Sequence, residues 1–297
     1  PYLDLNREEL CETIREGKYI PQPIRGKEIS KRNGKTRLLG IPTVVDRMLQ
    51  QAVTRVIMPQ FEYMFSDYSY GFRPQRNTLQ AAQKSLGYIN SGYQHIVDID
   101  LKGFFDEVNH CLLLDLLHRK VKCPVTMQLV RRWLRAPIWI NGELIKRRKG
   151  VPQSSSISPL LSNIMLHELD MEMEKQGLRF VRYADDFSIY CKTKREAREK
   201  GNQIYLYLRD KLKLPINREK SGIRRPVNFT LLGYGFVPTY KKGVKGQYQL
   251  IVEQSRWKQL KAKLKEETRK TIPMSFDERV QKIKEIQRGW INNLCLR

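Results

Sequence analysis

The chain has 297 residues, of which 40% are apolar, so it can bury a sizeable core and wholesale disorder is excluded. This length favours two or three subdomains that share one body. The 55 Lys and Arg residues outnumber the 31 Asp and Glu residues, which gives a formal net charge of +24. Such an excess favours a polyanionic partner, because neutralising phosphates releases counterions, and it indicates nucleic acid rather than a membrane surface.

The five cysteines are scattered and form no Cys-x-x-Cys pair, so neither a zinc ribbon nor a disulfide framework is expected. Free thiols fit a reducing cytosol. No apolar run reaches the ~18 residues that a membrane-spanning helix needs. The chain begins at Pro1 rather than Met, so we expect it to be an excised piece of a longer protein.

In the first third of the chain, the basic stretch Lys27 to Arg37 surrounds Asn33-Gly34, a turn signal. The sequence therefore predicts a hairpin whose second strand is 38–41. Pro42 ends that strand, and apolar residues at helical spacing predict a helix over 45–58.

In the middle of the chain, residues 96–101 form a short β-rich run that ends in acidic residues, and helices are predicted over 112–117 and 125–134. Asn141-Gly142 predicts a hairpin over 139–147. A helix is expected over 159–176, with Ser158 as its cap and Gly177 at its end. Two short strands are predicted around Ala184-Asp185-Asp186, followed by a helix over 196–213.

The last 57 residues, 241–297, hold 15 basic and 6 acidic residues. Apolar residues recur at helical spacing from Phe276 to Leu294, which predicts a basic amphipathic helix. A helix docked on the core explains the apolar stripe but leaves the charge excess unexplained.

The adjacent carboxylates Asp185 and Asp186 lie between two β-rich runs, where repulsion disfavours burial unless a cation is present. A plain hairpin with a polar tip is the alternative. Asp100 ends another strand, and Asp98 points to the same face of it. If these strands are neighbours, three carboxylates converge and could hold two metal ions about 4 Å apart. Asp98 stays a further candidate ligand, whereas Asp106 fits a structural role or a helix N-cap better.

Eight segments occur in an order that resembles the group II intron reverse transcriptase and maturase family. They lie within residues 27 to 234 and comprise GIPTVVDRMLQ (40–50), SYGFRP (69–74), DLKGFFD (100–106), GVPQ (150–153), SPLLSN (158–163), RYADD (182–186), NREK (217–220) and LLGY (231–234). The terminal Arg288-Gly289-Trp290 is similar to the start of that family's thumb or maturase region.

The resemblance implies a role for each matching residue. Asp100, Asp185 and Asp186 would bind two Mg²⁺ ions, with Mn²⁺ as a possible substitute, and Lys220 would act as a general acid toward pyrophosphate. Phe105 would block a ribose 2′-hydroxyl. Basic finger residues Lys31 and Arg37 would grip the triphosphate, and Gln153 would pack on the templating base. Tyr183, Leu232 and Gly233 would also contact substrate, the last two in the turn that grips the primer end.

One position departs from the family, which has Gly after the Pro-Gln pair where this chain has Ser154. A Cβ there would crowd the nascent base pair or alter the loop's backbone, without touching the carboxylates.

The resemblance implies an α+β, right-hand polymerase with an antiparallel palm sheet flanked by helices and a partial helical thumb. We expect fingers over 1–95, with parts of 110–150 inserted back into them, a palm over 96–240, and the start of a thumb or maturase region over 241–297.

The expected function is an RNA-directed DNA polymerase of a group II intron, which also binds intron RNA and assists splicing and retromobility. Its partners would be an RNA template, the intron RNA, a DNA primer and deoxynucleoside triphosphates, in a monomer or weak homodimer within a bacterial cytoplasmic ribonucleoprotein. The alternatives are a non-catalytic RNA-binding maturase, an RNA polymerase or a retron-type enzyme. Phe105 argues against the RNA polymerase.

Overall fold

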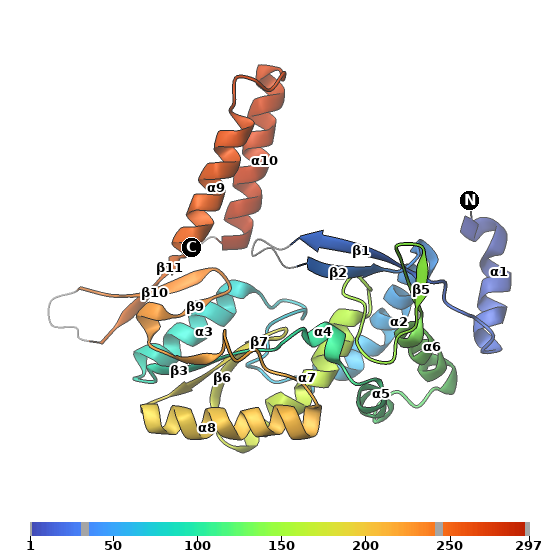
Figure 1. Ribbon diagram of the computed structural model, residues 1–297, viewed down its shortest axis with the longest axis horizontal. Coiled ribbons are helices and arrows are strands. Elements are labelled where there is room, and N and C mark those ends of the chain that lie inside the picture. Colours follow the sequence, from blue (N-terminus) through green and yellow to red (C-terminus); the bar gives the residue numbers. More distant parts are fainter. Residues whose placement is uncertain (1, 31–35, 241–245, 295–297) are drawn as a thin grey trace.

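The computed structural model describes residues 2–30, 36–240 and 246–294 (Figure 1). Its helices are α1 Tyr2–Arg15, α2 Val44–Glu62, α3 Thr78–Asn90, α4 Phe104–Glu107, α5 His110–His118, α6 Pro124–Arg135, α7 Ser158–Lys175, α8 Lys194–Tyr207, α9 Gln254–Glu267 and α10 Phe276–Leu294. Its strands are β1 Ile24–Ser30, β2 Thr36–Ile41, β3 His95–Asp100, β4 Ile138–Ile140, β5 Glu143–Ile145, β6 Arg179–Tyr183, β7 Asp186–Cys191, β8 Gly222–Arg224, β9 Thr230–Leu231, β10 Tyr234–Pro238 and β11 Tyr248–Val252. The α+β class is confirmed.

An antiparallel sheet with the strand order β6-β7-β3-β8 forms the centre of the molecule. Alternation along its strands gives it two apolar faces. Val97 and Ile99 lie in the core that includes residues of α7 and α8. Ile96, which points to the opposite face, lies in a second core, which includes residues of α3. Helices thus flank the sheet on both faces (Figure 1).

A second sheet, with the order β2-β1-β4-β5, lies apart from the central one. β1 and β2 pair antiparallel, as the Asn33-Gly34 signal predicted, although the turn itself falls outside the described residues. β4 joins β1 in parallel and turns back into β5. Asn141 and Gly142 both have positive φ, which is the conformation that an Asn-Gly hairpin turn requires, so that prediction is confirmed.

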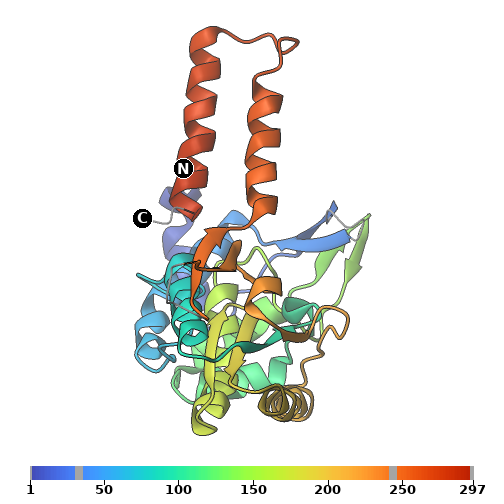
Figure 2. The ribbon, with the colours of Figure 1, turned by 90° about the vertical axis from the view of Figure 1, so that its left-hand side faces the viewer.

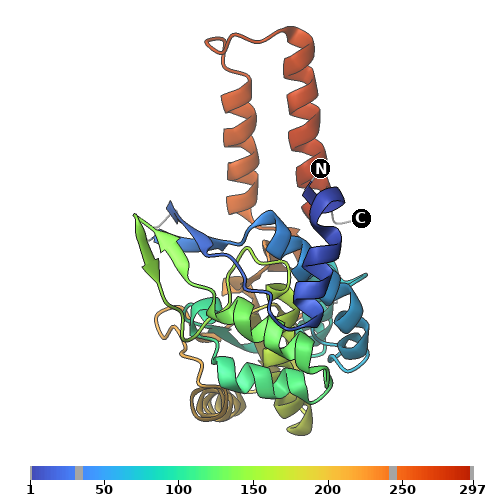
Figure 3. The same cartoon turned by 90° about the vertical axis from the view of Figure 1, so that its right-hand side faces the viewer.

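The C-terminal helices α9 and α10 pack on each other and project from the body as a hairpin (Figures 2 and 3). Trp257 of α9 and Trp290 of α10 have ring centroids 4.3 Å apart. Trp290 also packs against the small core formed by Ala82 and Tyr234, which connects the hairpin to the body. The helix predicted from Phe276 is confirmed, whereas α9 was not predicted.

Two boundary predictions need correction. Ser158 does not cap α7, because the helix includes it and its hydroxyl donates instead to the Pro152 carbonyl at 2.6 Å. The helix predicted over 196–213 ends as α8 at Tyr207 and continues as a π-helical turn, Leu208–Leu212, before Lys213 adopts a left-handed conformation.

Within the described ranges, no helix has both the length and the apolar character needed to cross a bilayer.

Candidate active site

The hairpin of β6 and β7 presents the two adjacent aspartates. Tyr183 pairs with Asp186 across the hairpin, so that Ala184 and Asp185 form its turn. Ala184 has a positive φ of 57°, a conformation that costs about 1 kcal/mol for a residue with a Cβ. Such strain at the tip of a hairpin is typical of a functional turn whose surroundings hold it in place.

The central strand β3 brings Asp100 to the same place. Asp100 lies directly opposite Asp186 in the antiparallel register of β3 and β7. Side chains of directly opposed residues share one face of a sheet, with Cβ atoms roughly 4.5–5.5 Å apart. Asp98 shares this face, but Arg224 of β8 donates to its carboxylate at 2.7 Å. Arg224 therefore engages the carboxylate that was a further candidate ligand.

A cavity of about 660 Å³ opens beside these strands. Five of the predicted site residues line it: Asp100, Phe105, Gln153, Asp185 and Lys220. The Lys220 Nζ lies 3.8 Å from the Asp100 Oδ2. Because these residues come from four separate segments, the fold brings together groups that are distant along the chain. The volume is in the range of pockets that hold small molecules.

The carboxylates repel one another. Asp186 is exposed as a residue, but nearby protein atoms partly desolvate its carboxyl group. Desolvation, followed by the charges of Asp98, Asp185 and Asp100, raises the pKa of Asp186 to about 7. Burial likewise raises the pKa of Asp98, against the opposing effect of Arg224. The charge on this end of the sheet favours a cation.

Hard carboxylate oxygens are the ligands that Mg²⁺ takes, usually together with substrate phosphates and water. The donor set of Asp100, Asp185 and Asp186 thus fits a divalent ion chemically. Across the described part of the chain, however, no three His, Cys, Asp or Glu side chains stand in an arrangement ready to hold a metal.

The repulsion predicts a pH-dependent effect on stability. When folding raises the pKa of a carboxyl group, the free energy of unfolding falls as pH rises from about 4 through about 7, because the folded state binds the proton more tightly than the unfolded state does. Asp186→Asn is therefore expected to raise the melting temperature at pH 8 by roughly 2–4 °C, allowing for solvent screening of this exposed group. At pH 4 wild type and Asp186→Asn should have the same melting temperature. Thermal unfolding at both pH values, with and without Mg²⁺, checks this; an equal shift at both pH values would contradict it.

Phe105 is held at the cavity wall through its backbone. Its carbonyl accepts a hydrogen bond from the Val151 nitrogen at 2.6 Å, and its ring meets that of Phe104 edge-on, with centroids 5.2 Å apart. Gly150 has φ of +83°, and a Cβ there would lie 2.9 Å from the Phe105 carbonyl oxygen. A glycine at 150 thus permits the close crossing that fixes Phe105. Asp106 lies inside α4, whose N-cap is Gly103, so the N-cap role considered for Asp106 is wrong.

The loop that carries Gln153 is tied to α2 by a buried glutamine. The Gln50 Oε1 accepts from the Ser155 hydroxyl at 2.7 Å and from the Ser156 nitrogen at 3.1 Å. Ser154 is half-buried. It is not among the described residues with positive φ, so its Cβ causes no backbone strain in the loop. Gln50 is a positioning residue that the sequence did not reveal.

Tyr183, Leu232 and Gly233 are not among the residues that line the cavity. Leu232 and Gly233 form a two-residue turn between β9 and β10, with φ of 55° and 90°. Leucine rarely adopts such a conformation. Tyr183 and Leu232 both pack against the core shared with α3. Arg37 lies on β2, opposite Ile29, and Lys31 lies outside the described residues.

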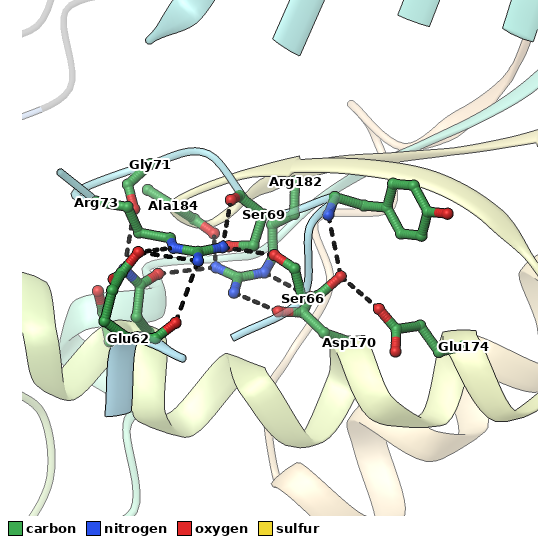
Figure 4. Close-up of polar contacts among 12 residues, drawn as sticks. Glu62, Ser66, Ser69, Gly71, Arg73, Asp170, Glu174, Arg182 and Ala184 are labelled. Atoms are coloured by element: carbon green, nitrogen blue, oxygen red, sulfur yellow. Dashed lines mark hydrogen bonds and ion pairs between the residues drawn. The ribbon is translucent and has the colours of Figure 1, made fainter. Parts of the chain in front are cut away.

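A buried polar network holds the β6–β7 turn from behind (Figure 4). Arg182 and Asp170 are both 0% exposed, and two hydrogen bonds of 2.7 and 2.5 Å join them. Arg182 also donates to the Ala184 carbonyl at 3.0 Å and to the Asn163 Oδ1 at 3.1 Å. Asn163 in turn donates to the Gly71 carbonyl at 2.9 Å. The network fixes the carbonyl of the strained residue that precedes Asp185.

The segment around Gly71 crosses the same turn. A Cβ on Gly71 would collide with the backbone nitrogen of Ala184. Arg73 holds this segment by donating to the carbonyls of Ser66 and Ser69, at 2.5 and 2.9 Å, and by an ion pair with Glu62. Gly71, Arg73 and Arg182 lie in motifs of the sequence that indicated no role for them. The glycine and the two arginines of the SYGFRP and RYADD motifs were the only signal.

Comparisons with known proteins agree with this arrangement. A family model described as reverse transcriptase (RNA-dependent DNA polymerase) matches residues 29–236, so the chain belongs to the reverse transcriptase family. The group II intron-encoded protein LtrA of Lactococcus lactis subsp. cremoris is 31% identical, over 76% of this chain and 49% of that protein. Protein YkfC of Escherichia coli (strain K12) is 32% identical, over 79% of this chain and 71% of YkfC. The resemblance to group II intron proteins is confirmed.

Solved structures support the fold. The telomerase of Candida tropicalis, in complex with a fragment of telomeric RNA, superposes with a TM-score of 0.61 over 96% of this chain and 56% of that one, at 14% identity. That identity supports the fold alone. The right-hand polymerase fold is thus confirmed. The chain spans about half the length of LtrA.

Proposed function

We propose that this chain copies RNA into DNA by adding deoxynucleotides to a primer. The observation that carries the proposal is the cavity beside the central sheet, which gathers Asp100, Phe105, Gln153, Asp185 and Lys220 from four segments between residues 100 and 220. In this reading, residues 96–240 are the palm, the β2-β1-β4-β5 sheet belongs to the fingers, and α9 and α10 begin the thumb.

Asp100, Asp185 and Asp186 would hold two Mg²⁺ ions, or Mn²⁺ in their place, and such ions neutralise phosphate charge and lower the pKa of an attacking hydroxyl. The chain's own residues orient the reactants. Lys220, whose Nζ lies 3.8 Å from the Asp100 Oδ2, would give a proton to pyrophosphate. Gln153 would pack on the templating base. Lys31 and Arg37 would hold the triphosphate, and Tyr183 with the Leu232-Gly233 turn would support the primer end.

The direct test is extension of a DNA primer annealed to an RNA template by this chain, with Mg²⁺ varied. We expect extension that requires both Mg²⁺ and deoxynucleoside triphosphates. Absence of extension at any Mg²⁺ or Mn²⁺ concentration, by a protein that is folded by thermal unfolding, would overturn the proposal.

Sugar selection provides a second prediction. Phe105→Ala opens the cavity wall where a 2′-hydroxyl would lie, so the ratio of ribonucleotide to deoxynucleotide incorporation should rise roughly 10–100-fold. Phe105→Tyr keeps the ring and serves as the control. Competition between the two sugars in one extension reaction measures the ratio. If wild type already uses both equally, Phe105 is not the sugar gate.

Binding of intron RNA in a bacterial cytoplasmic ribonucleoprotein, with assistance to splicing and retromobility, is the second proposed function. The net charge of +9 in residues 241–297 favours it, since α9 and α10 of this region project from the body as a hairpin, with no buried residue in α9. A gel-shift titration with group II intron RNA, using Asp185→Ala to remove polymerization, separates this function from catalysis.

A further inference from the structure

The β2-β1-β4-β5 sheet has two chemically different faces. On β1, Ile24 is 2% exposed, and the next residue, Arg25, is exposed. A Cβ at Gly40, which shares the face of Ile24, would contact Ile24 and Pro152, so this face packs on the body. Because successive side chains alternate, Arg25 and Lys27 lie on the opposite, outer face.

The register continues this outer face across all four strands. Arg25 lies opposite Ile41 of β2 and opposite Trp139 of β4. Trp139 in turn lies opposite Leu144 of β5. Residues directly opposed across a ladder share a face. One row of side chains therefore crosses the sheet in the order Ile41, Arg25, Trp139, Leu144.

This outer face exposes a flat aromatic ring beside positive charge. Trp139 is 49% exposed and Leu144 is 52% exposed. Arg25 and Lys27 are both exposed. The acidic residues of β1 and β5, Glu28 and Glu143, alternate to the other face. The outer face thus combines an aromatic stacking surface with positive charges, without acidic side chains from β1 or β5.

We propose that this outer face, made of Arg25, Lys27, Trp139 and Leu144, binds unpaired RNA. A base stacks on the Trp139 ring, which is tolerant of sequence because every base has a π-face. The two cations then lie one strand away, where they meet the phosphates of the same strand. An open sheet that stacks bases on outward aromatic side chains is a known means of holding single-stranded RNA.

The choice of a nucleic acid as the partner follows from charge complementarity. Two neighbouring cations, in a chain with a net charge of +24, disfavour a basic or neutral protein partner and favour a polyanion. The inference rests on the proposed function only in choosing RNA over single-stranded DNA. The face lies outside the lining of the cavity that holds Asp100 and Asp185.

The test is fluorescence-anisotropy titration of the full 297-residue chain with a labelled oligouridylate containing 4-thiouridine, at several salt concentrations. Trp139→Ala is expected to weaken binding at least about fivefold, and Trp139→Phe should restore most of it. Arg25→Gln and Lys27→Gln should each lower the slope of log affinity against log salt by about 0.7. Photocrosslinking should label the peptide that contains Trp139. An oligodeoxyuridylate should bind the same face with similar dependence on Trp139, since stacking does not read the sugar.

Tyr63, which is 72% exposed beside Lys120 and lies on α2's C-terminal side, is the matched control: Tyr63→Ala should bind as wild type does. Unchanged affinity of Trp139→Ala, with crosslinks elsewhere, overturns the proposal. So does a loss of self-association in sedimentation without loss of RNA binding, which assigns the face to a second copy of the chain. Primer extension on a pre-annealed duplex should survive in Trp139→Ala, so failure of extension by wild type tests the proposed function separately.

Discussion

Asp185→Ala is expected to lower the rate of primer extension by roughly a thousandfold or more, because charge stabilisation worth several kcal/mol at the transferring phosphoryl group is lost. Asp185 lines the cavity and lies in the turn beside Asp186, which pairs with Asp100. Removing it also relieves its repulsion with Asp186, so the variant should remain folded. Single-nucleotide extension under excess enzyme measures the rate, and thermal unfolding measures the stability.

The matched control is Asp115→Ala, which removes an exposed carboxylate on α5 and should leave extension unchanged. If Asp185→Ala extends primers within about tenfold of wild type while remaining folded, Asp185 does not belong to a metal centre and the two-ion mechanism fails.

Asp170→Asn is expected to lower the free energy of unfolding by about 3–5 kcal/mol, because it leaves the buried Arg182 without a counter-charge. The same change should slow primer extension even at temperatures well below the unfolding transition, since Arg182 also donates to the Ala184 carbonyl. Denaturant unfolding and extension at a low temperature measure the two effects. Arg119→Gln is the control: it breaks the exposed ion pair with Glu168, which should contribute about 0–1 kcal/mol.

A double variant distinguishes stability from positioning. Arg182→Met with Asp170→Leu replaces the buried pair by apolar side chains, which is often neutral or stabilising. Such a protein should regain much of the stability but not the extension rate, because no side chain then holds the Ala184 carbonyl. Full recovery of extension would show that the pair serves stability alone.

Local patterns in the sequence predicted the hairpins well. Asn141-Gly142 determines a turn through its own backbone preferences, and the alternation in residues 96–101 needs no distant partner. Ser158 shows where local reasoning fails. Serine is a favoured N-cap residue, but the Ser158 hydroxyl donates to the Pro152 carbonyl instead. That hydrogen bond depends on how the preceding loop folds back, which the local sequence does not indicate.

The site was predicted from motif order rather than from physical spacing. Nothing local in the sequence indicates that Arg224 neutralises Asp98, since their contact requires β8 to pair with β3 across 126 residues. The same holds for Gln50 and the Ser155 loop, which are 105 residues apart. Residue roles that depend on a partner's identity became visible only once the strands were placed.

The buried network has a consequence for how this protein can change by exchange of segments. Asn163 touches both Gly71 and Arg182, and Gly71 leaves no room beside Ala184 for any larger residue. The segments that carry Gly71, Asn163 and Arg182 are thus closely packed and hydrogen-bonded to one another. A chimera that takes residues 66–76 from one homologue and 158–186 from another combines segments whose packing does not match, and it should be destabilised. Exchange of the projecting α9–α10 hairpin should be tolerated better, because the hairpin contacts the body at its base, through Trp290.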